Sequence, residues 1–355
     1  MTRERRIEQL LGIDIPIIQA PMAGAQGAAM AIAVCEAGGL GSLPAALLSP
    51  EQLRTEIGIV RQRTSRPLNI NFFCHTPPKP DAGREAGWRQ RLDPYYREFA
   101  IDPAAPIPSS SRAPFDAAFC ALVEAFRPEV VSFHFGLPEA GLLDRVKATG
   151  AKVLSSATTV AEARWLEAHG ADAIIAQGYE AGGHRGIFLS DDIGSQPGLF
   201  ALLPQVVDAV TVPVIAAGGI ADARGIQAAL ALGAAAVQIG TAYLFTPEAT
   251  ITPMHRAALA EARDDATALT NLFTGRPARG LMNRLMREIG PMSPDAPAFP
   301  TAGGALAPLK ARAEAAGSAD FSSLWSGQAA ALGRPMGAGA LTRMLWDETL
   351  RRLGA

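Results

Sequence analysis

The sequence contains few cysteines and no apolar run long enough to cross a membrane. Cys35, Cys74 and Cys120 are odd in number and widely separated, which argues against a disulfide framework and favours reduced thiols in a cytoplasmic protein. A transmembrane helix needs about 20 consecutive apolar residues, and no such run occurs. The charged residues 1–6 are not followed by the apolar core of a signal peptide, so we do not expect secretion.

The chain also lacks an excess of charge of one sign. Its formal net charge of −2 gives no reason to expect binding to nucleic acid or to an anionic membrane. No pair of His, Cys, Asp or Glu residues has the spacing of metal ligands, so we predict no metal site. The Gly-x-Ser-x-Gly and Gly-x-Gly-x-x-Gly motifs are missing too. A homo-oligomer is compatible with the sequence but is not indicated by it.

Apolar strand candidates alternate with helical patterns over most of the chain. Near-continuous apolar runs are typical of parallel strands that are covered on both faces. Eight such strands separated by helices predict a (β/α)8 barrel of the TIM type, with an open α/β sheet as the alternative. The predicted strands are residues 15–20, 39–43, 68–73, 130–135, 152–156, 172–177, 212–217 and 235–239.

Helix start signals support this pattern. Ser49 precedes Pro50 and stands three residues before Gln52, which predicts a capping box. Thr159 and Glu162 predict a second capping box for a helix that runs to Gly170. Asp222 is expected to cap a helix over residues 223–232.

Two segments interrupt the alternation of strands and helices. Residues 76–114 are rich in proline, arginine and serine and form an insertion after the third strand, which would make a lid on the active-site face. Residues 249–355 are predicted to be a helical extension that packs on the barrel of residues 1–248.

Glycine-rich turns follow three of the predicted strands. The loop of residues 177–186 contains His184 among several glycines, and Gly218-Gly219 and Gly240-Thr241 end the next two strands. Loops after strands 7 and 8 of a TIM barrel often bind phosphate, and backbone N–H groups of the two turns can converge on one phosphate. His184 is then either a general base or anion-binding group, or an ordinary solvated loop histidine.

The ends of other predicted strands carry candidate ligand-binding residues, which the sequence pattern supports less strongly. The small residues around Pro21, Met22 and Ala23 would let a flat ring lie against the backbone, although an ordinary turn explains them equally well. Asn71 and Gln177 could hydrogen-bond a heteroaromatic ring or its side chain.

The remaining basic side chains each have two possible interpretations. Arg185 could hold an anion or pair with a surface carboxylate, His134 could be a core or a functional residue, and His75, His169 and His255 are expected in loops or at the surface.

Taken together, these segments resemble the nitronate monooxygenases, formerly called 2-nitropropane dioxygenases, and most of all their class I branch. The matching segments are QAPMAG (19–24), NFF (71–73), SFHFG (132–136), EAGGHRG (180–186), AAGGIAD (216–222), QIGTAY (238–243), FTGRPARG (273–280) and WSGQA (325–329). The resemblance covers the chain almost end to end, and it is weakest in the insertion after the third strand.

The resemblance implies a barrel that binds FMN and oxidises alkyl nitronates, such as propionate 3-nitronate, with O2 to carbonyl compounds and nitrite. His184 occupies the position of the family's catalytic histidine. The other implied FMN contacts are Pro21, Met22, Ala23, Asn71, Gln177, Gly182, Gly219, Gln238, Ile239, Gly240 and Thr241, to which the glycine pattern adds Gly218.

Three other functions remain open at this point. An FMN-dependent NAD(P)H:quinone or enoyl-ACP reductase would share the glycine loop and the phosphate turns. A non-catalytic FMN or phosphate-ligand sensor would bind the ligand without turning over any donor. A barrel aldolase or isomerase would need a lysine or carboxylate at a strand end, and the best lysine, Lys152, stands at the start of its strand.

Overall fold

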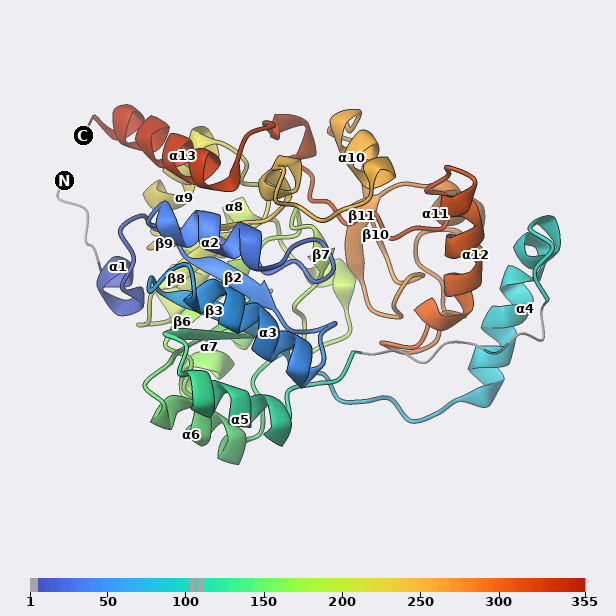
Figure 1. Cartoon of the computed structure of the whole chain (residues 1–355), viewed down its shortest axis with the longest axis horizontal. Coiled ribbons are helices and arrows are strands. Elements are labelled where there is room, and N and C mark those ends of the chain that lie inside the picture. The colour runs from blue at the N-terminus through green and yellow to red at the C-terminus, as the bar shows by residue number, and fades with distance from the viewer. Residues whose placement is uncertain (1–5, 103–105, 107–111, 355) are drawn as a thin grey trace.

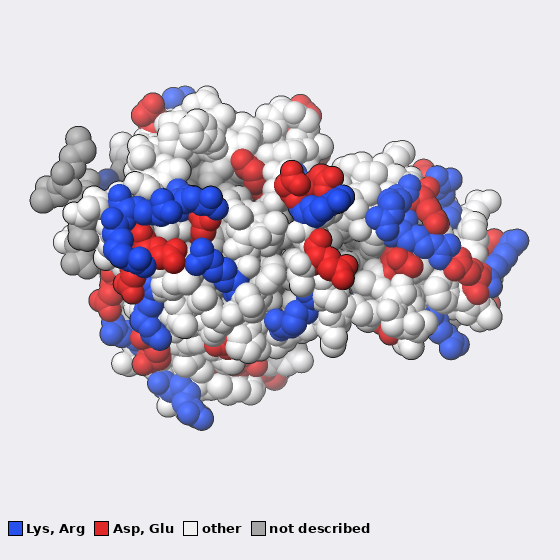
Figure 2. Space-filling model, turned by 90° about the horizontal axis from the view of Figure 1, so that it is seen from above, with Lys and Arg blue, Asp and Glu red and all other residues white. Residues whose placement is uncertain are grey.

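The computed structural model describes residues 6–102, 106 and 112–354. The charged residues 1–5, two stretches of the expected lid (103–105 and 107–111) and residue 355 lie outside the described residues. Among the described residues, no helix combines the length and the apolar character needed to cross a membrane. Acidic and basic side chains lie beside each other over the face that Figure 2 presents.

Eight parallel strands form a nearly closed barrel within the described part of the chain. A parallel bridge between Ile18 and Leu40 joins the two ends of the sheet. All eight strands lie where the apolar runs predict them, so the barrel is confirmed. In sheet order they are β1 (Ile17–Gln19), β9 (Ala236–Ile239), β8 (Val214–Ala217), β6 (Ala173–Gln177), β5 (Lys152–Ala157), β4 (Val130–His134), β3 (Leu68–Phe73) and β2 (Gly41–Pro44).

The strand register brings the carboxyl ends of the later strands level with one another. Gln177 at the end of β6 pairs with Ala217 of β8, and Ala217 pairs with Gln238 of β9. The loops that follow these strands therefore leave the barrel at the same face, where the active sites of TIM barrels lie.

Alternating side chains of the strands fill the barrel interior and the layer beneath the helices. Ile17 packs outward into a cluster with helix residues such as Val34 and Ile226, whereas Ile18 packs inward with Val130 and other strand residues. Each buried aliphatic side chain of this kind contributes about 1.5–3 kcal/mol. The helices around the barrel are α1 (Arg6–Leu11), α2 (Ala28–Glu36), α3 (Pro50–Arg61), α5 (Ala117–Phe126), α6 (Ala140–Ala148), α7 (Val160–Ala168), α8 (Leu199–Ala209) and α9 (Ala223–Ala231).

Two of the three predicted helix caps are present as expected. Ser49 and Gln52 form the reciprocal capping box of α3, and Asp222 caps α9. The capping box at Thr159 is wrong, because only half of it forms. Thr159 accepts from the Glu162 backbone N–H, but the buried Glu162 carboxylate accepts instead from the N–H groups of Thr158 and Phe188, both at 2.7 Å.

The insertion after β3 and most of the chain after residue 248 form a second lobe beside the barrel (Figure 1). Helix α4 (Ala82–Glu98) packs against α12 (Gly303–Ala315), and the Trp88 indole N–H donates to the Ala302 carbonyl at 3.1 Å. This packing places α4 at the side of the molecule. The rest of the lobe contains β10 (Thr267–Thr270), β11 (Ala278–Leu281), α10 (Pro253–Ala260) and α11 (Arg284–Ile289).

The chain after residue 248 contains a β-hairpin that the helical pattern did not predict. Strand β10 pairs antiparallel with β11, and β11 pairs in turn with β7 (Gly183–His184) from the glycine loop after β6. The final helix, α13 (Ala338–Leu353), returns to the barrel and packs on α2 and α9. The hairpin thus connects the second lobe directly to His184.

Candidate active site

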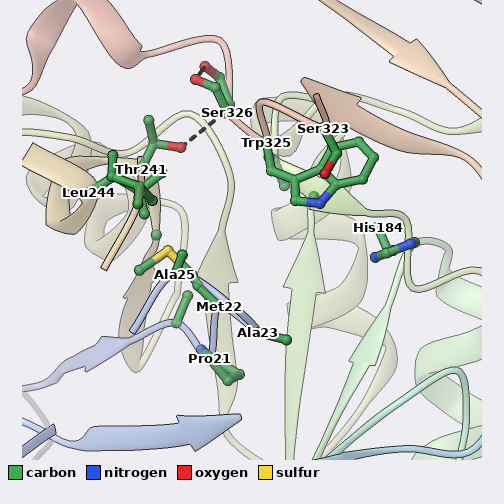
Figure 3. A pocket seen from close by; sticks show the side chains of 18 of the residues that line it. Pro21, Met22, Ala23, Ala25, His184, Thr241, Leu244, Ser323, Trp325 and Ser326 are labelled. Carbon is green, nitrogen blue, oxygen red and sulfur yellow. Dashed lines mark hydrogen bonds between the residues drawn. The ribbon is translucent and has the colours of Figure 1, made fainter. Parts of the chain in front are cut away.

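The carboxyl ends of the barrel strands and the second lobe enclose a cavity of about 390 Å³. Its walls come from the segment after β1, the loop after β6, the turns after β8 and β9, and residues 322–327 of the second lobe. In Figure 3, His184 and Trp325 lie on one side of this cavity, Thr241 and Leu244 on the other, and Pro21 to Ala23 between them. A cavity of this size accommodates a small-molecule cofactor and a small substrate.

All but one of the predicted site residues line this single cavity. The exception is Ile239, which is 1% exposed and packs in the core beneath the helices. Side chains alternate along a strand, so Gln238 and Ile239 cannot both face the cavity. The residues that line it are Pro21, Met22, Ala23, Asn71, Gln177, Gly182, His184, Gly218, Gly219, Gln238, Gly240 and Thr241.

The two glycine turns form one wall of the cavity. Gly218 and Gly219 have φ values of +113° and +68°, which residues with a side chain rarely adopt. The Thr241 hydroxyl accepts a hydrogen bond of 2.9 Å from the Gly327 N–H, which leaves its own proton for a ligand. The turns therefore present backbone and hydroxyl groups without a carbon side chain covering them.

The side-chain amide of Gln177 forms hydrogen bonds with the backbone of the loop after β6. Its Nε2 donates to the His184 carbonyl at 2.9 Å, and its Oε1 accepts from the Gly186 N–H at 2.8 Å. The second N–H of this amide and the second lone pair of its oxygen are left for a ligand. Gln238 differs, because its buried Oε1 has no hydrogen-bond partner among the residues that the structure describes. Such an orphaned acceptor indicates a ligand with a hydrogen-bond donor.

Arg185 has neither of the two roles expected from the sequence. Its side chain is fully buried, and its guanidinium donates to the carbonyls of Gly178 (2.6 Å) and Gln177 (2.9 Å) and to Gln196 Oε1 (2.7 Å). Burial lowers the pKa of Arg185 to about 10. This arginine holds the glycine loop in shape, because the loop's inward carbonyls would otherwise lack donors.

Contacts from both the barrel and the second lobe fix the position of His184. Its carbonyl accepts hydrogen bonds from Gln177 Nε2 and from His134 Nε2, the latter at 3.1 Å. Its imidazole Nε2 lies 3.0 Å from Thr274 Oγ1. The rings of Phe299 and Trp325 stand 5.3 and 5.5 Å from the imidazole, measured between ring centroids. The imidazole is thus held in a largely apolar wall.

His184 is surrounded by positive charge. Burial lowers the pKa of His184 well below its usual value, and the guanidinium groups of Arg112 and Arg276 lower it further. The imidazole is therefore neutral near pH 7, in the form that can accept a proton. The two guanidinium groups favour an anion in the cavity, since Arg112 is one of the residues that line it.

The other histidines are less exposed than the sequence suggested. His75 lies in a loop as expected but is only 4% exposed, and His169 is exposed as expected. His255 is 7% exposed and lies in α10, so its expected loop or surface position is wrong. His134 has the hydrogen bonds expected of a core histidine, and a functional role for it stays a prediction. It lines the cavity and is fully hydrogen-bonded, with Nδ1 3.1 Å from Ser156 Oγ and Nε2 bound to the His184 carbonyl.

Two residues near His184 had no role in the sequence interpretation. Thr274 contacts the His184 imidazole from the second lobe, and Arg112 lines the cavity from the end of the insertion. Neither stands at the end of a barrel strand. Thr274 falls within the segment FTGRPARG (273–280) that resembles the family, but that resemblance assigned it no role. Only the packing of the second lobe brings Thr274 to a residue 90 positions earlier in the chain.

Comparisons with known proteins agree with this architecture. The family model described as nitronate monooxygenase matches residues 4–348. The chain is 43% identical to a nitronate monooxygenase of Pseudomonas aeruginosa, covering 97% of this chain and 98% of that one. It is also 43% identical to a nitronate monooxygenase of Paraburkholderia phytofirmans, over 98% of this chain and 95% of that one.

A solved structure supports the same relationship. The structure of a nitroalkane oxidase from Streptomyces ansochromogenes superimposes with a TM-score of 0.88 at 40% sequence identity, covering 98% of this chain and 99% of that one. A match over the whole chain at this identity shows common family membership as well as a common fold. The chain therefore belongs to the nitronate monooxygenase family.

Proposed function

We propose that this protein oxidises alkyl nitronates, such as propionate 3-nitronate, with O2 to a carbonyl compound and nitrite, and that it uses FMN. The observation that carries this proposal is the imidazole of His184, held in the wall of a cavity that also contains two glycine turns. When bound, FMN supplies the electron-accepting chemistry, and the protein supplies binding, orientation and charge.

Several features of the cavity fit FMN. The small and apolar side chains of Pro21, Met22 and Ala23 offer a surface for a flat ring system. The orphaned Oε1 of Gln238 offers an acceptor for an N–H or O–H group of the cofactor. We place the phosphate at the turns of Gly218-Gly219 and Gly240-Thr241, where the Thr241 hydroxyl can donate to it.

The charges around His184 support an anionic substrate. A nitronate is an anion, and the guanidinium groups of Arg112 and Arg276 contribute positive potential at this end of the cavity. Protonated His184 would be a second way to hold the anion, but the lowered pKa of His184 disfavours that form in the free enzyme. We therefore assign anion binding to the positive potential of Arg112 and Arg276, and proton transfer to His184.

The nitroalkane form of a substrate requires one additional step. Its α-carbon must lose a proton, and neutral His184 is the base that the cavity offers for it. A nitronate has already lost that proton. General-base catalysis accounts for a rate factor of about 10²–10⁴, so this factor applies to nitroalkanes and not to nitronates.

The variant His184→Asn tests this division of roles. We expect turnover of a neutral nitroalkane to fall by about 10²–10⁴ and turnover of its nitronate to fall far less. His169→Asn is the matched control, because it removes an exposed histidine. Equal losses on both substrates would contradict the base assignment and leave a shared binding role for His184.

A flavin spectrum separates the proposed function from the reductase alternative. The purified protein is mixed without O2 with propionate 3-nitronate and, separately, with NADPH. Reduction of FMN by the nitronate alone, followed by nitrite release when O2 is admitted, supports the oxidation proposed here. Rapid bleaching by NADPH alone assigns the chain to the reductases, and a protein that takes up no FMN contradicts both.

A further inference from the structure

Thr274 stands directly behind the imidazole of His184. It is 2% exposed, it is not part of the cavity wall, and its Oγ1 lies 3.0 Å from His184 Nε2. The turn that carries it is held by Gly275, which has a φ of +90° and packs so closely on residues 297–299 that a Cβ would lie 2.1 Å from the Pro297 carbonyl oxygen. The hydroxyl therefore has a fixed position relative to the imidazole.

The backbone of His184 is fixed independently of Thr274. Its carbonyl accepts from Gln177 and His134, and its strand pairs with β11 at Ala278. What remains to be settled is which nitrogen of the ring carries the proton and which way the ring faces. Either choice changes the atom that meets a substrate.

The hydrogen-bond partners of Thr274 favour one of these tautomers. Its hydroxyl has one proton and two neighbouring acceptors, His184 Nε2 at 3.0 Å and the Arg276 carbonyl oxygen at 3.3 Å. A carbonyl can only accept. If the hydroxyl donates to the Arg276 carbonyl, its oxygen accepts from the Arg276 N–H at 3.4 Å and keeps a second lone pair for His184 Nε2–H, so that all of these groups are satisfied. In the opposite arrangement the hydroxyl donates its proton to Nε2, and the Arg276 carbonyl loses this hydrogen-bond donor.

The charge on the cavity side supports the same arrangement. If Nε2 carries the proton, the lone pair is on Nδ1, on the side of the ring away from Thr274. Arg112 lines the cavity, whereas Thr274 does not, and the positive charge of Arg112 lowers the pKa of His184. A lone pair facing this charge is favoured, whereas an N–H facing it is repelled.

We propose that Thr274 is a positioning residue that holds His184 as the Nε2–H tautomer and leaves Nδ1 as the atom that accepts the substrate proton. This inference rests on the proposed function, in which His184 is the base. Thr274 does not touch the substrate. It acts by keeping a single tautomer and a single ring orientation populated, so that the competent form is not diluted by the other one.

Nuclear magnetic resonance tests the tautomer without turnover. Protein labelled with ¹⁵N-histidine gives separate long-range ¹H–¹⁵N correlations for protonated and unprotonated ring nitrogens, and the signals absent from His184→Asn are those of His184. His134 and His255 serve as internal references, because Nε2 of each faces a carbonyl oxygen and must be protonated. His169 is the opposite reference, since its Nδ1 faces the Trp165 carbonyl.

The expected spectrum is specific for each variant. In the unmodified protein and in Thr274→Ser, His184 should show a protonated Nε2. In Thr274→Val, the signals of His184 should average between tautomers or move to Nδ1–H, while the references stay unchanged. A protonated Nδ1 in the unmodified protein, or an unchanged His184 in Thr274→Val, overturns the inference.

Kinetics give an independent test of the same residue. Thr274→Val should lower kcat/KM for a neutral nitroalkane by about 10-fold, part of the general-base factor, and change that for the nitronate by less than about 2-fold. Thr274→Ser should restore the rate. Thr270→Val is the matched control, because Thr270 is also buried and its hydroxyl accepts from the nearby Leu272 N–H, with no contact to a histidine among the described residues.

The outcomes for Thr274 and for the proposed function are distinguishable. Equal losses on both substrates in Thr274→Val, or no rescue by serine, overturn the positioning role. If the unmodified protein oxidises neither substrate, the proposed function fails, and the tautomer measured by resonance still decides whether Thr274 controls His184.

Discussion

His75 should make the stability of the protein sensitive to mild acid. Its imidazole is 4% exposed, and it packs perpendicular to Phe299 with a centroid distance of 4.7 Å. Burial, together with the charges of Arg276 and Arg112, lowers the pKa of His75 to about 4. The unfolded chain has a histidine pKa of about 6.5. Below that value the histidine of the unfolded chain binds a proton, whereas His75 of the native state stays unprotonated. The free energy of unfolding therefore decreases as the pH falls from 6.5 towards 4.

The magnitude follows from these two pKa values. At pH 5 the histidine of the unfolded chain lies about 1.5 pH units below its pKa, and each unit corresponds to about 1.4 kcal/mol. His75 alone should therefore cost about 2 kcal/mol of stability between pH 7.5 and pH 5. His75→Phe removes the titrating group and keeps a ring of similar shape against Phe299.

Urea unfolding of both proteins at the two pH values measures this difference. The comparison at pH 7.5 reports the packing of the new ring and serves as the control. The unmodified protein should then lose about 2 kcal/mol more than His75→Phe on going to pH 5. Parallel losses in the two proteins would refute the assignment of His75 as a buried neutral group.

Two further substitutions test the loop that carries His184. Gly182→Ala should release FMN from the purified protein, because the new Cβ would lie 2.5 Å from the backbone nitrogen of Gly327. Flavin absorbance per chain measures the loss. The control Gly141→Ala places a Cβ that meets no neighbour, so this variant should retain flavin. Arg185→Lys should lower the free energy of unfolding by about 2 kcal/mol or more, since lysine cannot replace the fork that satisfies the buried carbonyls of the loop. The surface control Arg145→Lys should leave urea unfolding nearly unchanged.

The barrel could be predicted because its signals are local. Each strand is a short apolar run, and the caps at Ser49 and Asp222 depend on residues within one helical turn. The failed box at Thr159 shows the limit of such signals. Glu162 has the expected spacing, but its carboxylate accepts a hydrogen bond from the N–H group of Phe188, 26 residues away. No local sequence pattern indicates a contact over that separation.

The candidate site could be predicted only from its barrel side. Glycines at strand ends marked the turns at Gly218 and Gly240, and a histidine in the glycine loop marked His184. Thr274 was invisible because its contact depends on how β11 pairs with β7. The burial of His75 escaped prediction for the same reason, because Phe299 from the second lobe covers it.

The second lobe contributes as much to the chemistry of His184 as the barrel does. The barrel supplies the donors that hold the His184 carbonyl, but Thr274 behind the ring and Trp325 beside it come from the lobe. The Gly327 N–H also donates to the Thr241 hydroxyl, so the same lobe orients a group at the glycine turns. A base that must be neutral, desolvated and of one tautomer needs partners on every side, and a barrel face alone leaves one side to water. The lobe closes that side, which explains why residues so far from the barrel strands govern the state of the histidine at their edge.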